Sequence, residues 1–175
     1  MNLPNKITLS RVIMIPVFLV FCYLSFPAAR YIALAVFILA SISDFLDGKL
    51  ARSRNLVTDF GKFMDPLADK CLVTAAMIVF VDWKLMPAWV LAVVLAREFA
   101  VSGLRMMAAS EGKVIAAAWS GKVKTASTMV CIILMFLPIP AWLDVVCWVV
   151  ILATTVYSGV EYFVKNRTVI DWTDL

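Results

Sequence analysis

The run WLDVVCWVVILATTVYSGVEYFV, residues 142–164, is mostly apolar and long enough to cross a lipid bilayer as one helix. Similar runs precede it, separated by short turn sequences. Lipid cannot satisfy unpaired backbone groups, so each run is predicted to be a helix. At about 20 residues a span, six helices fit the chain and leave about 55 residues for loops and ends. The other expected spans cover about 12–24, 31–44 and 71–81, a stretch starting near 88 and a stretch ending near 137.

The composition of the whole chain leads to the same fold class. Of the 175 residues, 63% are hydrophobic and 16% are charged, whereas soluble domains have about 45–50% and about 25%. A globule of 19.4 kDa could not bury this apolar excess. Soluble enzymes, secreted modules and nucleic-acid-binding proteins are therefore excluded as first interpretations. The prediction is an all-α integral membrane protein with six transmembrane helices, a single membrane domain over 1–175 with an interfacial segment at 1–10 and a cytoplasmic tail at 166–175.

Lysine and arginine are unevenly distributed between the two ends of the predicted spans. Apart from Arg97, which lies inside a span, only Arg30 and Lys84 fall on one side of the membrane. Basic residues accumulate on the cytoplasmic side of membrane proteins, so both termini are predicted to be cytoplasmic. The basic residues on that side are Lys6, Arg11, Lys49, Arg52, Arg54, Lys62, Lys70, Arg105, Lys113, Lys122, Lys124, Lys165 and Arg167.

The most polar block of the chain, residues 44–70, carries four aspartates between two predicted spans. On helices, each pair of them would share one face with residues of little bulk. Four carboxylates at a low-dielectric site repel one another, and hard divalent cations are suitable counter-ions. Two such ions about 4 Å apart could support an in-line phosphoryl displacement. The alternative is a solvated helix–loop–helix with scattered salt bridges. The residues concerned are Asp44, Asp47, Gly48 and Ala51 on one face, and Thr58, Gly61, Asp65 and Asp69 on the other.

The chain contains no histidine. This absence excludes Ser-His and Cys-His nucleophile pairs, histidine-ligated metals and histidine-dependent phospholipid transfer. The cysteines form no C-x-x-C pair and lie in apolar stretches, which favours a packing role over a metal or disulfide role.

The spacing of the polar block resembles a known signature. It reads Asp44-x-x-Asp47-Gly48-x-x-Ala51-Arg52, then eight residues, then Gly61-x-x-x-Asp65-x-x-x-Asp69. This is similar to the full motif of the CDP-alcohol phosphatidyltransferases. Further segments resemble the bacterial phosphatidylglycerophosphate synthases of that family, so the resemblance covers essentially the whole chain. These segments are Leu3-Pro4-Asn5 with Thr8 and Arg11, Ala96-Arg97-Glu98, Gly103-Leu104-Arg105 and Gly121-Lys122-Val123-Lys124-Thr125.

The resemblance implies a fold and a set of roles. The fold would be six transmembrane helices, usually in a homodimer, with a polar active-site cavity that faces the cytoplasm. Two divalent ions, Mg²⁺ or Mn²⁺, would bind the four motif aspartates, and Asp69 would also act as general base. The residues implied in binding CDP-diacylglycerol are Gly48, Ala51, Arg52, Thr58 and Gly61, with Asn5 and Thr8 closing over the nucleotide.

A second group of charged residues lies outside the motif. Arg97 lies about halfway through the fourth span, where an ionised group is costly and is expected to face the protein interior. Arg105 follows about 80° further round the helix, so both arginines can face one cavity. With Lys122 and Lys124 they suggest a site for the phosphate of an incoming alcohol. The alternative pairs Arg97 with Glu98 or a motif aspartate and treats the lysines as topology signals. Adjacent residues point about 100° apart on a helix, which weakens the case for a direct Arg97–Glu98 pair.

Together with these residues, the resemblance implies an enzyme of phospholipid synthesis in the bacterial cytoplasmic membrane. A cationic pocket fits glycerol 3-phosphate better than free inositol, serine or choline, which carry no phosphate. The expected reaction transfers a phosphatidyl group from CDP-diacylglycerol to glycerol 3-phosphate. An acceptor such as inositol phosphate stays open as an alternative. An ion-coupled carrier is a more remote alternative, because the acids cluster at one membrane face and no paired broken helices recur.

Overall fold

The computed structural model contains six α-helices and no strand among the residues that it describes. The all-α prediction is therefore confirmed for this part of the chain. The described residues are 3–53, 59–110, 112, 115–116 and 118–167, and within them the side chains of 3–8, 44–53, 59–63, 65 and 66 are left out of the description. The helices are α1 (Leu3–Tyr23), α2 (Ala29–Ser53), α3 (Asp59–Asp82), α4 (Ala88–Ser110), α5 (Trp119–Met135) and α6 (Ala141–Lys165).

The first three helices extend beyond the apolar runs from which they were predicted. Helix α1 begins at Leu3, α2 continues to Ser53, and α3 begins at Asp59. Hydropathy marks the part of a helix that suits lipid, whereas the helix itself continues as long as its backbone hydrogen bonds do. The polar block between the second and third apolar runs is therefore largely helical. All four motif aspartates lie on helices as a result.

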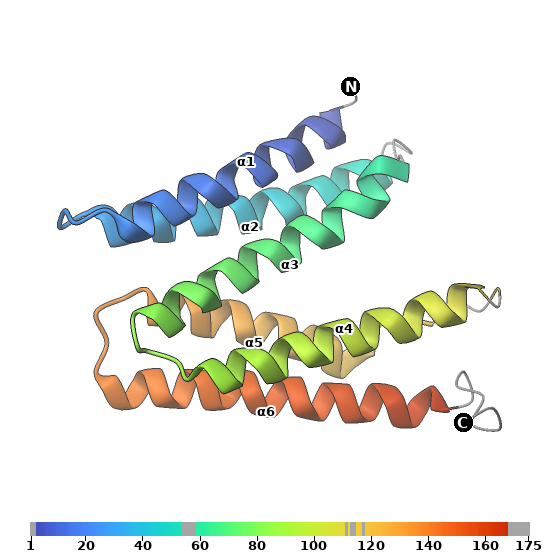
Figure 1. Ribbon diagram of the computed structural model, residues 1–175. Coiled ribbons are helices and arrows are strands. Elements are labelled where there is room, and N and C mark those ends of the chain that lie inside the picture. The colour runs from blue at the N-terminus through green and yellow to red at the C-terminus, as the bar shows by residue number, and fades with distance from the viewer. Residues whose placement is uncertain (1–2, 54–58, 111, 113–114, 117, 168–175) are drawn as a thin grey trace. The chain divides into compact units, whose positions relative to one another are not determined.

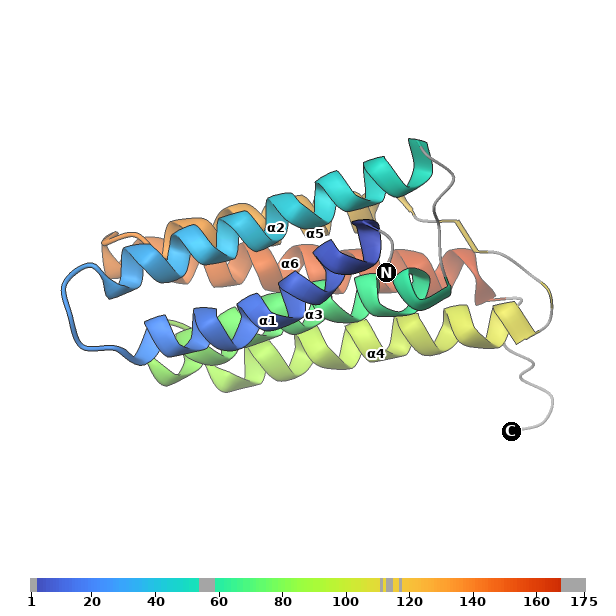
Figure 2. The same ribbon diagram turned by 90° about the horizontal axis from the view of Figure 1, so that it is seen from above.

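Residues 1–82 and 136–138 form one compact unit, called unit 1 here. Helix α1 packs along α2 and α3, and α2 also contacts α3 (Figures 1 and 2). Four phenylalanines meet in its core. The ring centroids of Phe80 and Phe136 are 4.8 Å apart, and Phe18 lies 5.7 Å from Phe136 and 6.0 Å from Phe37. Such ring contacts hold the three helices together through dispersion and edge-to-face attraction.

The remaining residues, 83–135 and 139–175, form unit 2. In this unit α6 packs against both α5 and α4. A buried cluster of Val101, Leu104 and Ala108 from α4 contacts Tyr162 of α6. Nearer the start of the same two helices, the rings of Trp89 and Trp148 meet edge to face at 5.9 Å. Helix α6 is thus the element on which the other two helices of unit 2 are assembled.

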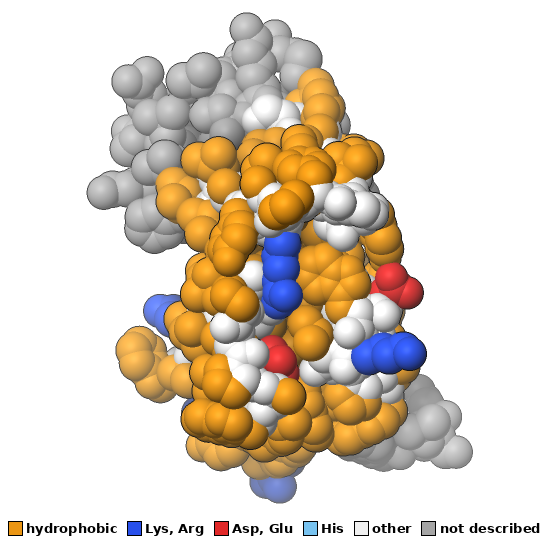
Figure 3. Space-filling view, turned by 90° about the vertical axis from the view of Figure 1, so that its left-hand side faces the viewer, with side chains coloured by type: hydrophobic (Ala, Val, Ile, Leu, Met, Phe, Trp, Pro, Cys, Tyr) orange, Lys and Arg blue, Asp and Glu red, His pale blue; other side chains and the backbone are white. Residues whose placement is uncertain are grey.

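The distribution of side chains is typical of a protein surrounded by lipid. On α6, Val146, Val149 and Val160 are exposed while Thr155 and Ser158 are buried. On the face shown in Figure 3, most of the described side chains are hydrophobic and few are charged. Among the described residues, the helix Ala141–Lys165 is the one long and apolar enough to cross a membrane. This helix corresponds to the apolar run at 142–164 from which the sixth span was predicted.

Candidate functional site: motif carboxylates and a cation network

The motif residues lie together at one end of unit 1. The beginning of α1, the end of α2 and the beginning of α3 are at the same end (Figure 1). Helix α2 carries Asp44, Asp47, Gly48, Ala51 and Arg52, and α3 carries Gly61, Asp65 and Asp69. Their side chains are outside the described part, except that of Asp69. Thr58 lies outside the described residues altogether.

Asp69 is partly buried on α3, one helical turn after Asp65. Helix α3 contacts α2, which carries the other two aspartates. The donor set is four carboxylates on two neighbouring helices. Carboxylate oxygens are the ligands that hard divalent ions such as Mg²⁺ prefer, and histidine or thiolate ligands are not required. The residues at this end of unit 1 are therefore suitable for the divalent ions that the motif implies.

The start of α1 brings polar residues to the same end. Asn5 and Thr8 lie in its first turns, and Arg11 follows Thr8 by one turn. The Arg11 side chain is fully buried, with an exposed fraction of 0%. A buried guanidinium is costly unless it is paired and hydrogen-bonded, so Arg11 belongs to a polar interior. Sequence reasoning used Arg11 for topology and for the family resemblance but gave it no binding or catalytic role, although a cation at the entry of an apolar run could have singled it out.

In unit 2, Arg97 lies midway along α4 and faces the interior, as predicted. Its side chain is 14% exposed, Nη1 donates to Oε1 of Glu98 at 3.0 Å, and Nη2 donates to Oγ of Ser158 at 3.1 Å. The Arg97–Glu98 pair, which the alternative interpretation predicted and the helix geometry disfavoured, is therefore present. The argument from the 100° between adjacent residues applies to their Cβ directions. The guanidinium is carried on a long flexible stem, so it can reach the neighbouring carboxylate.

Lys124 of α5 is bound to the same carboxylate oxygen. Its Nζ lies 2.6 Å from Oε1 of Glu98, and its side chain is only 10% exposed. Lys122, in contrast, is exposed. The two lysines are two residues apart, about 200° round a helix, so they face opposite sides. The structure thus separates two cations that the sequence had grouped.

Arg105 lies further along α4 and contacts α6. Its Nε donates to the hydroxyl of Tyr162 at 2.9 Å, and its guanidinium carbon lies 5.4 Å from the ring centroid of Tyr162. The residue is otherwise exposed. Anchoring through Nε leaves the two terminal nitrogens as a fork, which is the geometry that pairs with phosphate oxygens.

Three of the four predicted cations are therefore held by partners inside unit 2. Arg97 and Lys124 meet at Glu98, and Arg97 and Arg105 both contact α6, through Ser158 and Tyr162. Lys122 is exposed on α5, away from the buried Lys124. Sequence reasoning assigned no role to Ser158 or Tyr162, because nothing local indicated which α6 residues would face α4.

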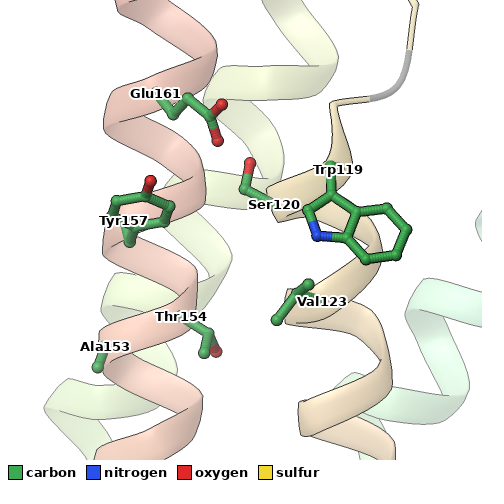
Figure 4. Close-up of a pocket in the computed structure, with 7 residues that line it drawn as sticks. All are labelled: Trp119, Ser120, Val123, Ala153, Thr154, Tyr157 and Glu161. Atoms are coloured by element: carbon green, nitrogen blue, oxygen red, sulfur yellow. The ribbon is translucent and has the colours of Figure 1, made fainter.

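A pocket of about 490 Å³ lies between α5 and α6 of unit 2 (Figure 4). Trp119, Ser120 and Val123 line it from α5, and Tyr157 and Glu161 line it from α6. None of its described lining residues is a lysine or arginine, and it includes a carboxylate. This pocket lacks the positive charge that a phosphate site requires, and it is distinct from the cation network around Glu98.

Comparison with known proteins identifies the family. The model of the CDP-alcohol phosphatidyltransferase family matches residues 1–157. A Bacillus subtilis protein named CDP-diacylglycerol–glycerol-3-phosphate 3-phosphatidyltransferase is 44% identical over 94% of this chain and 95% of its own length. A Salmonella typhimurium protein of the same name is 38% identical over 95% of each chain. The chain therefore belongs to the CDP-alcohol phosphatidyltransferase family.

Proposed function

We propose that this protein transfers the phosphatidyl group of CDP-diacylglycerol to sn-glycerol 3-phosphate, giving phosphatidylglycerol phosphate and CMP. The observation that carries the proposal is the similarity, over nearly the whole chain, to relatives whose names state this transfer. The carboxylate motif and the cation network are both consistent with it. The carboxylate motif would bind the diphosphate of the CDP group through divalent ions. The cation network suits a phosphorylated alcohol.

The donor site would lie at the end of unit 1 that carries the motif. Asp44, Asp47, Asp65 and Asp69 would hold two divalent ions, Mg²⁺ or Mn²⁺. When bound, such ions neutralise the pyrophosphate and stabilise the charge that develops on it. The small motif residues would leave room for CDP. The residues proposed to contact it are Gly48, Ala51, Arg52, Thr58 and Gly61, with Asn5 and Thr8 of the N-terminal segment.

The reaction is a single displacement at the β-phosphorus. The primary hydroxyl of glycerol 3-phosphate attacks, a new P–O bond forms, and the bond to the bridging oxygen breaks. CMP leaves with that oxygen and its electron pair. The hydroxyl proton passes to the carboxylate of Asp69, which is partly buried and can serve as a base at a desolvated site.

The acceptor phosphate would bind the cations of unit 2. Arg97, Arg105 and Lys124 are each oriented by a neighbouring side chain. Lys122, which is exposed, would contribute long-range attraction. Four cations with one interposed carboxylate leave a net positive site, and a phosphate dianion is a suitable ligand for it.

The membrane arrangement follows the same proposal. All six helices would cross the bacterial cytoplasmic membrane, with both termini and a polar active-site cavity on the cytoplasmic side. Residues 1–175 would form a single membrane domain and work as a homodimer. Residues 1–10 would lie at the interface, and 166–175 would form a cytoplasmic tail.

An acceptor panel tests the proposal. Purified protein in detergent receives CDP-diacylglycerol with Mg²⁺ or Mn²⁺ and one acceptor at a time: glycerol 3-phosphate, inositol phosphate, inositol or serine. We expect CMP release and lipid product with glycerol 3-phosphate only, and none after chelation of the metal. Product with inositol phosphate alone would overturn the choice of acceptor. Absence of metal-dependent CMP release with every acceptor would favour a carrier.

Replacing Arg105 by alanine should raise the KM for glycerol 3-phosphate about ten- to a hundredfold. Charge-assisted hydrogen bonds contribute about 1.5–3 kcal/mol each, and every 1.4 kcal/mol is about tenfold in affinity. The KM for CDP-diacylglycerol should stay within about twofold, because Arg105 lies outside the donor motif. Steady-state kinetics with each substrate varied in turn measures both values.

Lys165→Ala is the matched control for this variant. Lys165 is a cation of the same unit that pairs with Glu161 on the exposed side of α6. Its removal should change neither KM by more than about twofold. If Arg105→Ala raises both KM values equally, or only that for the nucleotide lipid, Arg105 does not bind the acceptor.

A further inference from the structure

One carboxylate oxygen joins two buried cations from different helices. Oε1 of Glu98 accepts from Nη1 of Arg97 at 3.0 Å and from Nζ of Lys124 at 2.6 Å. The exposed fractions of the three side chains are 14%, 18% and 10%. At this degree of burial, charge-assisted bonds are strong and screening by salt is weak. Glu98 therefore sets the distance between the two cationic groups.

The contacts leave donors on both cations. An ammonium has three N–H groups, and Glu98 engages one of those of Lys124. Nη2 of Arg97 is bound by Ser158, while its Nε has no hydrogen-bond partner among the described residues. Lys124 is thus fixed at one point and Arg97 at two, and each still has N–H groups for a further anion. Such an arrangement favours binding of a ligand, because the rotamer entropy of both long side chains is lost before the ligand arrives.

The stem of Arg97 is held as closely as its head group. A Cβ placed on Gly159 of α6 would come within 3.0 Å of Cγ of Arg97. Such a distance is shorter than an ordinary van der Waals contact, so a larger residue at position 159 would require the arginine stem to shift by a few tenths of an ångström. The lack of a side chain at Gly159, together with the hydroxyl of Ser158, defines where the guanidinium can lie.

We propose that Glu98 is a positioning residue for the acceptor phosphate. It acts through Arg97 and Lys124 and holds the two cations at the separation that the phosphate requires. The inference rests on the proposed function, because it refers to the same acceptor site. A carboxylate by itself would repel a phosphate. Because Glu98 holds the two cations in place, it would instead favour binding of the phosphate.

The first test compares Glu98→Gln and Glu98→Ala with the wild-type protein. The amide oxygen of glutamine can still accept both hydrogen bonds, but they are weaker because the acceptor is neutral. We expect kcat/KM for glycerol 3-phosphate to fall about tenfold for glutamine and further for alanine, with the KM for CDP-diacylglycerol unchanged within about twofold. Glu161→Gln, which removes the charge of the Glu161–Lys165 ion pair on α6, should leave both constants unchanged.

A double-mutant cycle shows whether Glu98 acts through Lys124. In the Lys124→Ala background, one of the two held cations is absent, so Glu98→Gln should lower kcat/KM by no more than about threefold. Non-additivity of this kind is what interacting side chains produce. If Glu98 were purely structural, the losses in kcat/KM of the two single variants would multiply in the double variant. Both single variants would also have lower thermal stability, and their kinetic defects would not differ between the two substrates.

Gly159→Ala tests the same arrangement without any change of charge. The added methyl group should push Arg97 away from Glu98 and Ser158, and so raise the KM for glycerol 3-phosphate about three- to tenfold. Gly103→Ala is the matched control, because a Cβ at that position meets no atom within 4 Å. It should leave the KM unchanged.

The outcomes separate this inference from the proposed function. If Glu98→Gln leaves the kinetics of glycerol 3-phosphate unchanged while Arg105→Ala still raises its KM, the positioning role is wrong and the acceptor site stands. A lower KM for glycerol 3-phosphate in Glu98→Gln would also overturn it, since it would mean that the carboxylate only repels the phosphate. If the wild-type protein shows no activity with glycerol 3-phosphate, the proposed function itself fails.

Discussion

Replacement of Asp69 by asparagine is expected to abolish turnover while the protein still folds and inserts. Asparagine is nearly isosteric with aspartate, but it carries no charge for the divalent ions and cannot take the proton of the attacking hydroxyl. Loss of a general base alone typically lowers the rate about 10²- to 10⁴-fold, and loss of a metal ligand adds to this. Release of CMP from CDP-diacylglycerol in the presence of glycerol 3-phosphate measures the effect.

The control for this variant is Asp82→Asn. Asp82 lies at the far end of the same helix, α3, and is exposed. The same chemical change there should leave turnover within about twofold of wild type. Thermal unfolding in detergent should show Asp69→Asn to be at least as stable as wild type, because one carboxylate fewer reduces the repulsion within the motif. Activity of Asp69→Asn within tenfold of wild type would remove Asp69 from both of its proposed roles.

Replacement of Gly48 by leucine should prevent nucleotide binding, with a loss of affinity for CDP of more than about a hundredfold. On the continuous helix α2, Gly48 follows Asp44 by four residues and Asp47 by one, so it lies on the carboxylate face. A branched side chain there would fill the space that the pyrophosphate or cytidine needs. Calorimetric titration with CDP and Mg²⁺ measures the affinity directly.

Gly103→Leu provides the comparison. Gly103 lies on α4, outside the motif, and a Cβ there meets no atom within 4 Å. Its affinity for CDP should equal that of wild type. Unchanged CDP affinity in Gly48→Leu would mean that the small residue at position 48 serves helix packing instead of the nucleotide site.

Sequence reasoning predicted the helices better than their ends. Apolar runs and turn sequences predicted turns at 25–30 and 82–87, and the structure has them at 24–28 and 83–87, because loss of hydropathy and the presence of proline coincide there. The third apolar run, which begins at residue 71, placed the beginning of α3 too late. The stretch from Asp59 onward includes polar residues, yet it is helical. The four aspartates were found from their spacing alone, because residues four apart share a face on any helix.

The partners of the buried charges could not be predicted in the same way. Spacing on one helix shows which residues share a face, but not which residue of another helix will meet that face. Lys122 and Lys124 have the same chemistry and nearly the same position, yet only Lys124 is buried against Glu98. Tyr162 and Ser158 carry no motif and were found only by their contacts with α4.

The sequence by itself determined the all-helical class and the family, because hydrophobic composition and a spaced carboxylate motif are properties of the chain in one dimension. Only the tertiary structure decided how the cations are held. The side chains of Arg97 and Lys124 are long, and their positions depend on Glu98 and on the packing of α6 against α4 and α5. Burial makes those contacts strong, and burial arises only when the helices come together.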